Sequence, residues 1–62
     1  AWERCAMYRA YNLYSLFSQA SAANPAYASE AERYRQQVLQ ICYDSNCPEN
    51  EPYVELYLQE LE

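Results

Sequence analysis

Hydrophobic residues recur at spacings of three and four along most of this chain, which is the period of an α-helix. In the first part they form one stripe, which Leu16 widens and which consists of Trp2, Ala6, Ala10, Leu13, Phe17 and Ala20. The stripe predicts a helix over about residues 2–23. Asn24-Pro25 ends it, because the residue before a proline avoids the α region.

A second stripe of the same period follows, made of Tyr27, Ala31, Tyr34, Val38 and the pair Ile41/Cys42. It predicts a helix over about residues 25–43. Two starts are open: Asn24 caps the helix with Pro25 in the first position, or Ser29–Glu32 forms a capping box one turn later.

Turn-forming residues fill the next stretch, Asp44–Asn50, before the helical pattern resumes. A third helix is predicted over residues 51–61, with Asn50 as its cap and an apolar face of Val54, Tyr57, Leu58 and Leu61. A helix this short is marginal in isolation, so we expect it to pack on the other two.

These segments predict an all-α fold, an antiparallel helical hairpin with a short third helix folded across it, similar to a three-helix bundle. With 62 residues the chain is expected to form a single small domain. A chain of this size buries only about 60% of its unfolded surface, so a disulfide or a partner would add needed stability.

The three cysteines are expected to meet at the open end of the hairpin. Cys5 lies about twenty residues before the predicted hairpin turn, so the matching level on the second helix is near residue 44. Cys42 and Cys47 flank that level. Either could form a disulfide with Cys5, which would indicate an extracellular or periplasmic protein. The alternative is that Cys5 and Cys42 are reduced, buried thiols.

Charge is distributed unevenly, with a net value of −5. Four arginines against three glutamates leave residues 1–43 at +1, whereas six acidic residues without a base put residues 44–62 at −6. An acidic surface repels phosphate, which argues against nucleic acids and anionic membranes as partners. No apolar run is long enough for membrane insertion.

The sequence offers no catalytic, cofactor or metal site. It contains no His, the commonest general base and metal ligand, and the only carboxylate near the cysteine cluster is Asp44. Carboxylates two residues apart, such as Glu30 and Glu32, lie on different helix faces. We therefore expect that the protein is not an enzyme.

Candidate residues for binding a protein partner lie on the first and third helices. Tyr8 and Tyr11 fall on the polar side of the first helix near Arg4, and Tyr with Arg is typical of interface hot spots. Glu51 and Glu55 provide an acidic face on the third helix. The alternative for the two tyrosines is that the third helix covers them.

The stretch LYSLFSQASAANPAYASEAERY resembles the junction between tetratricopeptide repeats. With the residues that follow it, the resemblance covers about residues 13–38. Phe17, Ala20 and Pro25 match the family spacing of an aromatic residue, an alanine and a proline, although Leu13 stands where the family has a small residue. The resemblance implies a piece of a helical repeat array that binds protein.

Two functional hypotheses follow from the helices and the cysteines, and a third follows from the charge pattern. The first is a non-enzymatic protein-interaction or structural helical module, alone or as a segment of a larger helical assembly. The second is a small secreted helical ligand, such as a pheromone, toxin or inhibitor, stapled by a disulfide. An acidic inhibitor that mimics nucleic acid is a third, based on residues 44–62 alone. The oligomeric state is left open.

Overall fold

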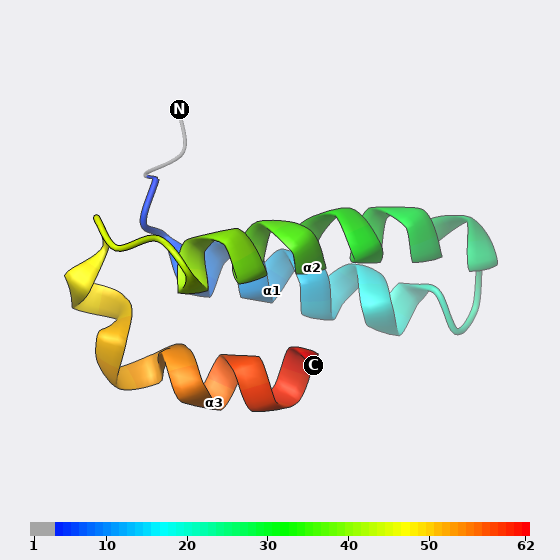
Figure 1. The fold of residues 1–62 in the computed structure, drawn as a ribbon. Helices are drawn as coiled ribbons and strands as arrows, with labels where there is room; N and C mark the ends of the chain where they lie inside the picture. Colours follow the sequence, from blue (N-terminus) through cyan, green and yellow to red (C-terminus); the bar gives the residue numbers. More distant parts are fainter. Residues whose placement is uncertain (1–3) are drawn as a thin grey trace.

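The computed structural model describes residues 4–62, and in this part of the chain all regular structure is helical (Figure 1). The elements in order are α1 (Met7–Ala20), the 3-10 turn η1 (Pro25–Tyr27), α2 (Ala28–Cys42), the 3-10 turn η2 (Pro48–Asn50) and α3 (Glu51–Leu61). The predicted all-α, three-helix fold is confirmed. None of these helices combines the length and the apolar character that crossing a bilayer requires.

The α1 and α2 helices form an antiparallel hairpin, and α3 turns back along it from the open end (Figure 1). Both α1 and α3 run from the open end of the hairpin toward the side where its turn lies, so the two helices have the same direction (Figure 1). As a result α3 covers the open-end part of the hairpin.

The core is small and takes residues from all three helices: Met7, Ala10, Val38, Cys42 and Leu61. Met7 and Val38 are the largest fully buried side chains. Near the turn of the hairpin, α1 and α2 pack through aromatic rings. Phe17 stacks on Tyr34 with ring centroids 5.5 Å apart, and its ring centroid lies 5.7 Å from that of Tyr27. The hairpin is therefore held by aliphatic packing at one end and by aromatic packing at the other.

The first helix is shorter than predicted. The expected start at Trp2 lies outside the described residues, and residues 4–6 are not helical, so α1 begins at Met7. At the other end, Ala22 and Ala23 donate backbone hydrogen bonds to the carbonyls of Gln19 and Ala20, three residues earlier, which is the 3-10 pattern. The α-helix therefore ends at Ala20, earlier than the predicted residue 23. Leu16, expected in the buried stripe, is 62% exposed.

Asn24 and Pro25 start a 3-10 turn as expected, but α2 itself begins only at Ala28, and no side chain caps it. The Asn24 side chain accepts a hydrogen bond from the backbone N–H of Ala26 at 3.1 Å, with Pro25 opening the 3-10 turn η1. The Ser29 hydroxyl donates to the Ala26 carbonyl instead of capping α2. The chain thus passes from Asn24 through a short 3-10 turn into the α-helix.

Candidate functional site

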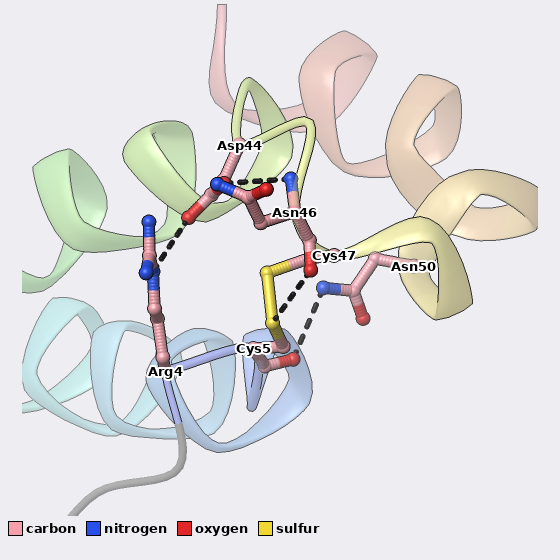
Figure 2. Close-up of polar contacts among 6 residues, drawn as sticks. All are labelled: Arg4, Cys5, Asp44, Asn46, Cys47 and Asn50. Carbon is pink, nitrogen blue, oxygen red and sulfur yellow. Dashed lines mark hydrogen bonds and ion pairs between the residues drawn. A yellow bond between two sulfur atoms is a disulfide. The ribbon is translucent and has the colours of Figure 1, made fainter.

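The candidate site lies at the open end of the hairpin, where residues 4–5 meet residues 44–50; we call these segments together the stapled end (Figure 2). A disulfide joins Cys5 to Cys47, with the two Cα atoms 5.5 Å apart. Cys42 is left as a buried free thiol. Of the two pairings that the sequence left open, the structure has the one with Cys47.

The turn after α2 presents Cys47 to its partner. The Asp44 side chain accepts a hydrogen bond from the backbone N–H of Asn46 at 2.9 Å, which is the local turn expected of an aspartate. The N–H of Cys47 donates to the Asp44 carbonyl at 3.2 Å, and Pro48 then opens η2. This compact turn leaves Cys47 buried against Cys5.

Asn50 connects the same two segments through a second, non-covalent link. Its side-chain amide donates a hydrogen bond to the Cys5 carbonyl at 3.0 Å (Figure 2). That carbonyl also accepts from the N–H of Met7 at 2.9 Å. Asn50 occupies the N-cap position of α3 as the sequence predicts, but its side chain makes no capping hydrogen bond to that helix. Its buried amide is used to fix the turn.

Arg4 has an acidic partner within the chain. Its Nε lies 3.0 Å from an Asp44 carboxylate oxygen, and the arginine side chain is 71% exposed (Figure 2). The backbone N–H of Asn46, followed by the Arg4 guanidinium, lowers the pKa of Asp44 below its ordinary value. Arg4, a predicted partner residue, is therefore already paired on the surface of the stapled end.

A pocket of about 360 Å³ opens beside this turn and is bounded by α3 between Glu51 and Leu58. It is lined by Cys42, Asp44, Ser45, Cys47, Pro48, Glu51, Val54, Glu55 and Leu58. Its buried members are the two cysteines, whereas Glu51 and Glu55 are exposed at its rim. Two of the predicted partner residues thus border one hollow.

The free thiol of Cys42, which lines the pocket, is expected to be unreactive. The Cys42 sulfur lies 3.3 Å from the Met7 sulfur in the core. Burial, and to a lesser degree the charge of Glu62, raises the pKa of the Cys42 thiol, which keeps it protonated at neutral pH. Within residues 4–62 no group of three or more cysteine or carboxylate side chains is placed to hold a metal ion.

The two tyrosines predicted for partner binding have different environments. Tyr11 packs edge-on against Tyr57 with ring centroids 4.8 Å apart, and its hydroxyl donates to the Glu60 carboxylate. This hydrogen bond and burial raise the pKa of Tyr11 to about 12. Tyr8, by contrast, is 56% exposed. Hence α3 covers Tyr11 and leaves Tyr8 accessible.

Sequence reasoning missed Val54 and Leu58 as pocket residues, because it assigned both to the core-facing side of the third helix. The wall they form depends on how α3 lies against the turn, and periodicity carries no signal for that. The pairing of Arg4 with Asp44 did have a signal, because the register that aligned Cys5 with residue 44 also aligns these two side chains.

Comparisons of this chain with protein-family models, curated proteins and solved structures find no match. The resemblance to tetratricopeptide repeats stays a prediction.

Proposed function

We propose that this chain is a non-enzymatic, disulfide-stapled helical protein that acts by binding a protein partner. Protein binding is common to both functional hypotheses from the sequence. The Cys5–Cys47 disulfide favours the secreted stapled ligand over a module of a cytosolic assembly, because disulfides persist in oxidising compartments. An extracellular or periplasmic location belongs to this proposal.

The observation that carries the proposal is the outward side of α3. Tyr53 and Leu56 lie one turn apart on it and are 56% and 65% exposed. Large apolar side chains grouped on a rigid helix are typical of an interface core, and tyrosine is enriched in hot spots. Tyr8 on α1 and Tyr43 at the end of α2 add two further exposed rings.

The test uses the oxidised 62-residue chain as bait in the extracellular or periplasmic fraction of the source cells. Each captured protein is purified, and its affinity is measured by isothermal titration calorimetry. We expect saturable binding that weakens about tenfold or more in Y53A/L56A, since interface hot spots contribute at least about 2 kcal/mol. The control L16A removes an apolar side chain of similar exposure, 62%, from another helix and should bind as the wild type does.

Two results would contradict the proposal: no captured protein binds saturably, or Y53A/L56A and L16A lose affinity equally. A melting experiment separates the two hypotheses on the form of the protein. A cooperative transition of the isolated oxidised chain supports the free ligand, and folding only in the presence of neighbouring domains supports the module.

A further inference from the structure

We propose that the pocket at the stapled end receives an arginine side chain of the protein partner. This inference rests on the proposed function and specifies the chemistry that the partner must present. It is carried by three features of the pocket, namely its shape, the distribution of its charges and the way its walls are fixed.

The shape suits a side chain with an apolar stem and a charged head. A volume of about 360 Å³ falls at the lower end of the range of ligand pockets, roughly 300–1,000 Å³. Val54 and Leu58 contribute aliphatic surface, and the buried sulfur-bearing residues Cys42 and Cys47 line its inner side. The methylenes of an arginine can lie along such a wall while its guanidinium stays at the rim.

The charge at the rim is negative and unpaired within the described chain. Glu51 and Glu55 are one helical turn apart, so both carboxylates lie on the same side of α3. The ion pairs among residues 4–62 join Arg4 to Asp44, Arg33 to Glu30 and Arg35 to Glu32, and none uses Glu51 or Glu55. No basic residue lines the pocket.

A guanidinium fits these acceptors better than a metal ion does. It carries five N–H donors in a planar fork, which can reach two carboxylates at once. The third lining carboxylate, Asp44, is already held by Arg4 and by the N–H of Asn46. Residues 4–62 contain no group of three or more cysteine or carboxylate side chains placed to hold a metal ion. The rim therefore favours an organic cation.

The walls are fixed before any partner arrives. The Cys5–Cys47 disulfide and the hydrogen bond from Asn50 to the Cys5 carbonyl tie the turn to the start of α1. Because Cys47 and Pro48 line the pocket, the same links hold its inner side in place. A preorganised pocket loses less conformational entropy on binding than a flexible one.

The inference is tested by titrating the oxidised chain with the capped tripeptide acetyl-Ala-Arg-Ala-amide while recording ¹⁵N and methyl NMR spectra. We expect saturable shifts centred on Val54, Leu58 and the turn. The same peptide with citrulline in place of arginine keeps the shape but lacks the charge, so we expect its affinity to be at least about tenfold lower.

The variant E51Q/E55Q removes both rim charges at exposed positions, and its NMR spectrum establishes that it is folded. It should lose affinity for the arginine peptide by about tenfold or more. The matched control E30Q/E32Q removes the same number of charges at the other end of the hairpin and should keep wild-type affinity. Equal losses in both variants, shifts centred outside the pocket, equal binding of the citrulline peptide, or no saturable binding would each overturn the inference.

The purified partner separates this inference from the proposed function. If Y53A/L56A loses partner binding while E51Q/E55Q binds as the wild type does, the arginine pocket is refuted and the protein-binding function stands. If the arginine peptide binds in the pocket but no partner is captured, the function is refuted and the pocket chemistry stands.

Discussion

At the scale of single residues, polar side chains at the stapled end and beside α3 connect segments far apart in the sequence. Asn50 is 9% exposed and reaches a carbonyl 45 residues earlier in the chain. Tyr11 reaches Glu60 across 49 residues. A buried polar group without a partner is costly, so the hydrogen bond of Asn50 favours the observed path of the turn before α3.

Tyr11 gives the stability of the protein a dependence on alkaline pH. Its pKa is raised from 10.0 to about 12 in the folded protein, chiefly because its hydroxyl donates to Glu60. The contribution of this hydrogen bond to the free energy of unfolding is complete below pH 10 and is lost as the pH rises towards 12. We expect Tyr11→Phe to lack this loss, so that its urea midpoint falls less between pH 9.5 and about 11.5 than that of the wild type.

Tyr8→Phe is the matched control, since Tyr8 is exposed and makes no hydrogen bond in the described chain. It should keep the wild-type dependence on pH. Spectrophotometric titration at alkaline pH should show one tyrosine fewer ionising near 12 in Tyr11→Phe. A wild-type pH dependence in that variant would show that the Tyr11–Glu60 bond does not couple α3 to the hairpin.

At the scale of elements, α3 is the part that depends most on its contacts. It has 11 residues, which is short for an isolated helix. Leu61, in its last turn, is 5% exposed and belongs to the core with Met7 and Val38. The Arg35 guanidinium adds a hydrogen bond to the Leu61 carbonyl at 3.0 Å, which holds the end of α3 against α2.

We expect Leu61→Ala to destabilise the protein by about 2–4 kcal/mol, because it removes buried methyl groups and leaves a cavity. Leu56→Ala, on the same helix but 65% exposed, should change the stability by less than about 0.5 kcal/mol. Urea unfolding followed by circular dichroism measures both. Similar costs for the two variants would mean that α3 does not pack through Leu61 as described.

Periodicity explains how much of the fold was predictable. Apolar stripes of helical period identified all three helices and the antiparallel hairpin, because burial of one face imposes that spacing. The start of α1 was not predictable in the same way. Residues 4–6 leave the helix where Cys5 is tied to Cys47 and Asn50, a tertiary constraint that has no local pattern.

The candidate site was predictable only in part, for the same reason. The register of the antiparallel hairpin predicted that Cys5 lies level with about residue 44. It did not decide whether Cys5 pairs with Cys42 or with Cys47, because these lie on either side of that level. Glu51 and Glu55 were identified as an exposed acidic face. These two glutamates border a pocket because of the path that residues 44–50 take. The turn-forming residue types in this stretch predict a turn but not its path.

At the scale of the whole molecule, the chain closes its hairpin by different means at its two ends. The Asn24-Pro25 turn closes one end through sequence-local hydrogen bonds. The disulfide closes the other across a sequence separation of 42 residues. A covalent link over so long a loop chiefly restricts the unfolded chain, which suits a domain whose core has few large buried side chains.

The disulfide should therefore dominate the stability. In the chain-entropy model a loop of this length contributes about 4 kcal/mol, so we expect C5A/C47A to lose about that much and to unfold at much lower urea concentration. Cys42→Ala removes a buried thiol without opening the loop and should cost about 1 kcal/mol. Mass spectrometry of never-reduced, denatured wild type should show one alkylated thiol, and three after reduction. If Cys42→Ala were as costly as C5A/C47A, local packing around the sulfurs, rather than loop closure, would be what stabilises this end of the hairpin.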